Sequence, residues 1–79
     1  MRLDKYLKIS RLIKRRAVAN DACDNDRVMV NGRDAKASYQ VKLGDVIEIA
    51  FGNRVLLVEV TDITENAKKA VAAAMYREL

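Results

Sequence analysis

Residues 27–32 read RVMVNG, a short alternating segment followed by a tight-turn signal. Its two valines fall on one side of an extended chain and its methionine on the other, which is the period of a β-strand. The closing Asn-Gly pair accepts positive φ at both positions, as a two-residue hairpin turn requires. The segment therefore predicts a strand that turns back into a short partner around residues 34–36.

Two longer strands are predicted downstream of this hairpin. Residues 45–51 alternate again and are expected to place two isoleucines and Phe51 toward the core. A Gly-Asn turn at 52–53 then leads into a longer alternating segment, residues 54–63. These two segments are expected to pair as a hairpin.

Helices are predicted on both sides of the strands. Met1–Ser10 and Leu12–Cys23 form two N-terminal helices, with Ser10 as a cap for the second. After Asn66, apolar residues recur near helical spacing and predict a C-terminal helix that packs on the sheet. Its apolar stripe consists of Ala67, Ala70, Val71, Ala74 and Met75. We therefore expect a single α+β domain over residues 1–79, with two N-terminal helices, a small twisted antiparallel sheet and a C-terminal helix.

The positive charge is concentrated in the first sixteen residues. The chain carries a net charge of +4, yet residues 1–16 hold seven basic side chains against one acidic one, and the other 63 residues hold eight basic and ten acidic side chains. Such an asymmetry points to a polyanionic partner. Charge alone leaves RNA, DNA and an anionic membrane open.

Few of the side chains that usually carry out catalysis are present in the sequence. The sequence has no His, no Cys-x-x-Cys pair and no phosphate-cradling Gly-rich loop, and its one cysteine, Cys23, lies in an apolar-periodic stretch typical of a buried thiol. No apolar run approaches the roughly 20 residues that cross a bilayer. We expect a cytoplasmic binding protein, not an enzyme, without metal or other cofactor.

The densest basic segment lies at the start of the second predicted helix. Arg11 and Arg15 are one helical turn apart and are expected to share a face, and the planar guanidinium matches phosphate oxygens. The alternative is a solvated helix face. Asp4, the one acid nearby, either forms an ordinary exposed pair with Lys8 or Arg11 or orients a basic side chain toward a ligand, and the sequence leaves both open.

Five segments in a fixed order carry a family resemblance. They are Arg2-Leu3-Asp4-Lys5-Tyr6-Leu7, Ser10-Arg11, the basic helix, Val28-x-Val30-Asn31-Gly32 and Gly44-Asp45-x-Ile47. As a set they resemble the RNA-binding domain of ribosomal protein S-four, the αL motif, over residues 1–50. Asp26 departs from the family, which usually has Gly before the strand.

A second resemblance spans nearly the full chain. Residues 1–16, the AKAS segment at 35–38, the second hairpin and the ending at Tyr76 are similar to the RqcP-like family of small bacterial ribosome-quality-control factors. This resemblance implies binding to large-subunit rRNA and P-site tRNA on obstructed large ribosomal subunits. It also implies support of C-terminal alanine tailing of stalled nascent chains, together with the NEMF-family protein that delivers alanyl-tRNA. Neither a membrane nor a small-molecule substrate is expected as a partner.

The expected RNA-binding residues follow from position in this family and from charge. They are Arg2, Asp4, Lys8, Arg11, Lys14, Arg15, Arg16, Lys36 and Ser38. For Lys36 and Ser38, phosphate contact and simple exposure both remain open. Three other functions also remain: a related heat-shock factor that rescues obstructed subunits and usually carries a longer basic tail, an accessory RNA-binding subunit of an RNA-modifying enzyme, and a general RNA chaperone.

Overall fold

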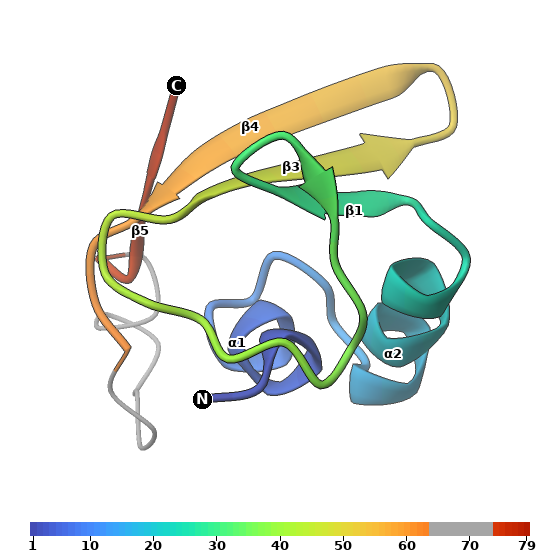
Figure 1. Ribbon diagram of the computed structural model, residues 1–79, viewed down its shortest axis with the longest axis horizontal. Coiled ribbons are helices and arrows are strands. Elements are labelled where there is room, and N and C mark those ends of the chain that lie inside the picture. The colour runs from blue at the N-terminus through green and yellow to red at the C-terminus, as the bar shows by residue number, and fades with distance from the viewer. Residues whose placement is uncertain (64–73) are drawn as a thin grey trace.

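The computed structural model describes residues 1–63 and 74–79 as two helices packed on one face of a sheet (Figure 1). The helices are α1 (Leu3–Ile9) and α2 (Arg16–Asp24). The strands are β1 (Val28–Val30), β2 (Arg33–Asp34), β3 (Val46–Phe51), β4 (Arg54–Val60) and β5 (Tyr76–Glu78). Every pairing is antiparallel, in the order β2-β1-β3-β4-β5. The predicted α+β class, helix pair and antiparallel sheet are confirmed.

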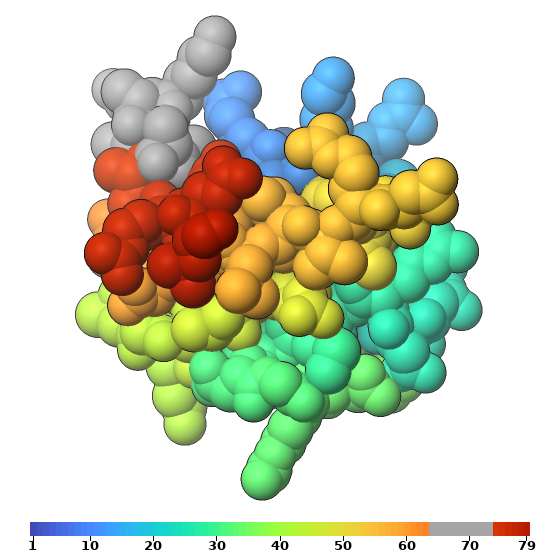
Figure 2. Space-filling view, turned by 90° about the horizontal axis from the view of Figure 1, so that it is seen from above, coloured from blue at the N-terminus to red at the C-terminus, as the bar shows by residue number. Residues whose placement is uncertain are grey.

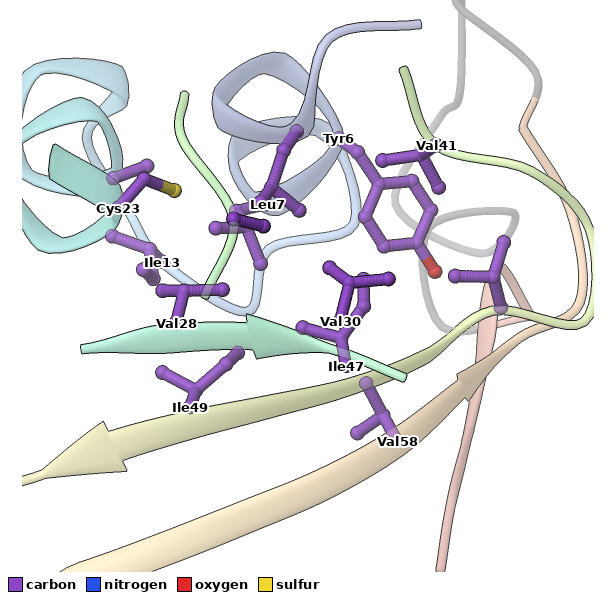
Figure 3. Close-up of a cluster of buried hydrophobic side chains, with 14 of the residues drawn as sticks. Tyr6, Leu7, Ile13, Cys23, Val28, Val30, Val41, Ile47, Ile49 and Val58 are labelled. Carbon is purple, nitrogen blue, oxygen red and sulfur yellow. The ribbon is translucent and has the colours of Figure 1, made fainter. Parts of the chain in front are cut away.

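The core forms where the alternating strands face the helices (Figure 3). Val28 lies opposite Ile49 and Val30 opposite Ile47, and all four side chains are buried. Leu3, Tyr6 and Leu7 cover them from α1, and Cys23 from α2. Burial raises the pKa of the Cys23 thiol to about 11, aided by the nearby Asp4 and Asp24 carboxylates, so the predicted buried thiol is confirmed.

One residue predicted for the core is misplaced. Phe51 belongs to the same face of β3 as Ile47 and Ile49, but its side chain is 42% exposed. The tip of the β3–β4 hairpin stands away from α2 (Figure 1), and Phe51 borders a hollow of about 310 Å³ shared with Val18 and Ala22, so this last inward position has less to pack against.

The second helix begins four residues later than predicted. Ser10 ends α1, with its Oγ donating to the Leu7 carbonyl, and Arg11 takes a left-handed φ of 64°. The Ile13 N–H returns to the Leu7 carbonyl at 3.0 Å and the Ile13 side chain is buried. A left-handed residue closes the helix end and cannot continue it. Ser10 is therefore not a cap for α2, and Arg11 does not share a helical face with Arg15.

The chain ends in a strand where a helix was predicted. Residues 64–73 of that prediction lie outside the described residues, but Tyr76–Glu78 pair with β4 as β5. The buried Met75 places its carbonyl where the Tyr6 hydroxyl donates at 2.7 Å and the Thr61 N–H at 2.8 Å. These tertiary contacts and the ladder with β4 outweigh the local helix propensity of Ala, Met and Glu.

The long connection from β2 to β3 is fastened to both layers. Leu3 and Asp4 at the start of α1 donate their N–H groups to the carbonyls of Tyr39 and Ala37, at 2.8 and 3.2 Å. Asp45, which is buried, accepts from the Tyr39 hydroxyl at 2.8 Å and from the Asn31 amide at 3.1 Å. This connection therefore satisfies helix donors that would otherwise lack partners.

Left-handed backbone marks the turns before and after β1. Asn31 and Gly32 have φ of 54° and 81° and form the predicted two-residue hairpin turn, which leads into β2 at Arg33–Asp34. Asp26, where the family usually has Gly, has φ of 60°. An L-residue pays a steric cost in this conformation that glycine avoids.

We predict that Asp26→Gly raises the free energy of unfolding by about 1 kcal/mol, because glycine removes the Cβ from a left-handed position. Urea denaturation followed by circular dichroism measures the change. Asp26→Ala is the matched control, since it removes the same carboxylate and its ion pair with Lys36 but keeps the Cβ. Equal stability of the Gly and Ala variants would contradict the backbone explanation.

We predict that Asp45→Asn lowers the free energy of unfolding at pH 7 by about 1–3 kcal/mol and flattens its acid dependence. Burial alone would raise the pKa of Asp45, but donation by the Lys42 N–H, the Tyr39 hydroxyl and the Asn31 amide holds this pKa below its ordinary value. The native carboxylate thus stabilises the fold above about pH 4, and this stabilisation is lost as the pH falls through the lowered pKa. Denaturation at pH 7 and pH 3 measures it, and an unchanged acid dependence in the variant would refute it.

Candidate nucleic-acid interface

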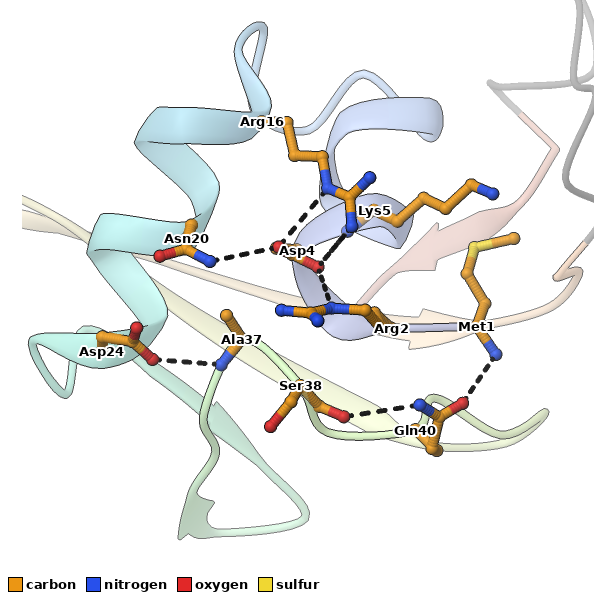
Figure 4. Close-up of polar contacts among 10 residues, drawn as sticks. All are labelled: Met1, Arg2, Asp4, Lys5, Arg16, Asn20, Asp24, Ala37, Ser38 and Gln40. Atoms are coloured by element: carbon orange, nitrogen blue, oxygen red, sulfur yellow. Dashed lines mark hydrogen bonds and ion pairs between the residues drawn. The ribbon is translucent and has the colours of Figure 1, made fainter.

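Two arginines and an asparagine converge on the buried carboxylate of Asp4 (Figure 4). Arg2 precedes α1 and places its Nε 3.2 Å from Asp4 Oδ1. Arg16 opens α2 and places its Nε 3.4 Å from Asp4 Oδ2, and Asn20 donates to Oδ2 at 3.2 Å. The Lys5 N–H donates to Oδ1 at 2.8 Å. The carboxylate thus joins the N-terminal segment to both helices.

The environment keeps Asp4 ionised although it is buried. Its side chain is 3% exposed, and burial alone would raise its pKa. Donation by Asn20, Arg16, Arg2 and the Lys5 N–H outweighs this effect and lowers the pKa below its ordinary value. The side chains of Arg2 and Arg16 remain 46% and 49% exposed, so the anchored guanidinium groups also face solvent. One negative charge therefore holds two cations in place and leaves an excess of positive charge.

This geometry rules out one of the two interpretations of Asp4. The expected exposed pair with Lys8 or Arg11 is wrong, because Asp4 is buried and its cationic partners are Arg2 and Arg16. The orienting interpretation fits the contacts. Asn20 was missed as a member of this site, although its position four residues after Arg16 places both on one face of α2.

A second group of cations lies beside the first. Lys8, Arg11 and Lys14 line a shallow hollow of about 360 Å³ where α1 gives way to the loop. Arg15, at the entry to α2, is exposed. Within residues 1–63 and 74–79, none of these four side chains forms an ion pair. Figure 2 shows blue side chains of the N-terminal part projecting at one edge of the molecule.

Lys36 and Ser38 occupy the connection between β2 and β3, and both are exposed. The loop brings Ser38 next to the N-terminal segment, because Arg2 pairs with Gln40 and the Asp4 N–H reaches the Ala37 carbonyl. Lys36 instead lies 3.4 Å from the Asp26 carboxylate. Both members of this pair are more than 60% exposed, so it contributes little to stability and leaves the ammonium accessible.

The groups that the described residues bring together at this surface are mainly positively charged side chains. They contain no group of three or more His, Cys, Asp or Glu side chains able to hold a metal ion. No helix among them is long and apolar enough to span a bilayer. Oriented guanidinium groups with free donors suit phosphate oxygens, since they bind two oxygens at once.

Comparisons with known proteins agree with a nucleic-acid interface. A model of the S4 domain family matches residues 1–47. The chain is 54% identical over 76 residues to the RQC P-site tRNA stabilizing factor of Streptococcus pneumoniae, covering 96% of this chain and 86% of that protein. The factor of the same name from Bacillus subtilis is 49% identical over 76 residues, covering 96% of this chain and 88% of that protein.

A more distant similarity leads to heat shock protein 15. The Escherichia coli protein is 36% identical over 78 residues, which cover 99% of this chain and 59% of that protein. A trimeric structure of the Vibrio cholerae protein superposes with a TM-score of 0.91 at 31% identity, covering all of this chain and 81% of that one. The whole described fold is thus shared with this protein.

We predict that Asp4→Asn weakens binding to a short RNA hairpin by about tenfold, although it raises the net charge by one. The amide cannot hold two guanidinium groups by charge, so Arg2 and Arg16 lose their orientation. Fluorescence anisotropy at fixed salt measures the affinity, and circular dichroism checks the fold.

The matched control is Asp34→Asn, which makes the same change of charge on β2. A general electrostatic attraction would strengthen binding in both variants. Tighter binding by Asp4→Asn would therefore reject the orienting role of Asp4.

Proposed function

The chain belongs to the S4 domain family, in the group that contains the RQC P-site tRNA stabilizing factors, and on this premise we propose that it binds and steadies tRNA on the ribosome. Its ligands are large-subunit rRNA and P-site tRNA, on large subunits left obstructed by peptidyl-tRNA. There it supports C-terminal alanine tailing of the stalled nascent chain, alongside the NEMF-family protein that delivers alanyl-tRNA. The protein acts by binding and performs no reaction.

The observation that carries this proposal is the guanidinium pair anchored on Asp4. Arg2 and Arg16 come from opposite ends of the basic segment, yet one buried carboxylate holds both at the surface. A pair fixed in this way loses little side-chain entropy when it binds phosphates. It supports recognition of a particular arrangement of phosphates, as on a folded RNA, better than attraction to any polyanion.

The remaining cations extend the same surface. Lys8, Arg11, Lys14 and Arg15 have no acidic partner among the described residues, and their mutual repulsion costs stability that a bound phosphate backbone relieves. In this arrangement one RNA contacts Arg2 and Arg16, and a second RNA contacts the loop between α1 and α2. A brace between rRNA and tRNA needs two contact areas, and the presence of two groups of cations supports this proposal.

Rescue of obstructed subunits in the manner of heat shock protein 15 is the second candidate. The shared fold, with a TM-score of 0.91, favours it. The lower identity, 36% against 54%, and the smaller covered share of the E. coli protein, 59% against 86%, favour tRNA stabilization.

We predict that Arg2→Ala combined with Arg16→Ala abolishes co-sedimentation with obstructed large ribosomal subunits. Loss of the anchored pair removes at least two phosphate contacts, so the salt dependence of any residual binding also becomes shallower. Sedimentation of tagged protein from a lysate, followed by identification of the bound RNA and protein, measures it. For the unaltered chain we expect large subunits, P-site tRNA and the alanine-tailing factor.

Arg33→Ala combined with Lys42→Ala is the matched control, because it removes the same charge at exposed positions away from Asp4. It should bind nearly as well as the unaltered chain. Equal binding by both double variants would sink the proposed role of the pair, and recovery of free mRNA in place of large subunits would reject the function.

A further inference from the structure

The single phenylalanine of the chain lies half-exposed between two hollows, of which the second has a mainly apolar lining. Phe51 lines a hollow of about 270 Å³ with Leu12 and Arg54. It also lines a hollow of about 310 Å³ with Val18 and Arg27. Val18 and Val55 nearby are 53% and 65% exposed. The Phe51 ring and Val18 thus form an accessible apolar patch at the hairpin end of the sheet, on the face that the helices cover.

Two arginines flank this patch. Arg27 and Arg54 are exposed and form no ion pair within residues 1–63 and 74–79. One acidic residue, Glu78, contributes to the rim of the first hollow. A ligand that suits the patch therefore combines a flat apolar surface with negative charge.

The patch adjoins the basic loop, residues 10–15, which joins α1 to α2. Leu12 lines the first hollow and Ile13 the second, and these two residues separate Arg11 from Lys14 in the chain. Figure 2 shows the same proximity, with the gold hairpin beside the projecting blue side chains of the N-terminal part. An RNA strand whose phosphates contact the loop is thus within reach of Phe51.

We propose that Phe51 stacks on an unpaired nucleobase of the RNA bound by the basic loop, with Arg27 and Arg54 facing the adjoining phosphates. This inference rests on the proposed function and adds a base-binding position to it. Stacking on an aromatic side chain is sequence-tolerant and is the common way in which proteins hold splayed bases. Both hollows lie near the lower limit of small-molecule pockets, which suits one flat ring.

The test compares two RNA hairpins with identical phosphates. One carries a single unpaired adenosine beside the stem, and the other has an abasic site at that position. We expect the unaltered chain to bind the first about tenfold more tightly, and Phe51→Leu to lose this preference while binding the abasic hairpin as before. Leu43→Ala, at an exposed apolar position on another turn, is the matched control and should keep the preference.

Phe51→Trp adds an optical measurement, because the chain contains no Trp. Its affinity should match that of the unaltered chain, and its fluorescence should be quenched by the adenosine hairpin and not by the abasic one. Circular dichroism of each variant checks the fold.

The outcomes separate this inference from the proposed function. Equal affinity of the unaltered chain for both hairpins would overturn stacking and leave RNA binding standing. Binding to neither hairpin would overturn both. A lower sedimentation mass for free Phe51→Leu than for the unaltered chain would show an interface between copies, which also overturns stacking.

Discussion

The buried carboxylate of Asp4 constrains the whole N-terminal half of the protein. A buried charge is tolerated only when its partners stay in place. Arg2, Arg16 and Asn20 are therefore held in position by their contacts with Asp4. Asp4 belongs to α1, and its partners come from the N-terminal segment and from α2. The same contacts therefore pack α1 against α2 and place Arg2 and Arg16 at the surface.

The sheet supports this arrangement through the connection between β2 and β3. That connection supplies the carbonyls that accept from the first N–H groups of α1, and Asp45 fixes its far end. Helix position thus depends on carbonyl groups that lie more than thirty residues along the chain from the N–H groups they accept. A surface with oriented guanidinium groups gains from such a frame, because a displacement of α1 would break hydrogen bonds elsewhere.

Sequence patterns that act within a few residues predicted most of the strands. Where the prediction failed, the structure depends on contacts between distant residues. Alternation and the Asn31-Gly32 pair act within a few residues, so β1, β3 and β4 were found close to their observed bounds. The start of α2 was misplaced because a left-handed arginine is not visible in a pattern. The strand at Tyr76 depends on the free edge of β4, and the partners of Asp4 lie 2 and 12 residues away on separate segments. Helix and strand propensities hold no information on the open edge of β4 or on the partners of Asp4.

The bond from the Tyr6 hydroxyl to the Met75 carbonyl joins residues 69 apart. The fully buried Tyr6 side chain thus obtains its polar partner from the segment that leads into β5. While Met75 is still inside the exit tunnel of the ribosome that makes it, α1 has a phenol without its acceptor and β4 has an open edge. Proteins with many such distant pairings fold more slowly than those with local ones. The core therefore cannot be completed before residues 75–78 have left the ribosome, because they supply the acceptor for Tyr6 and the last strand of the sheet.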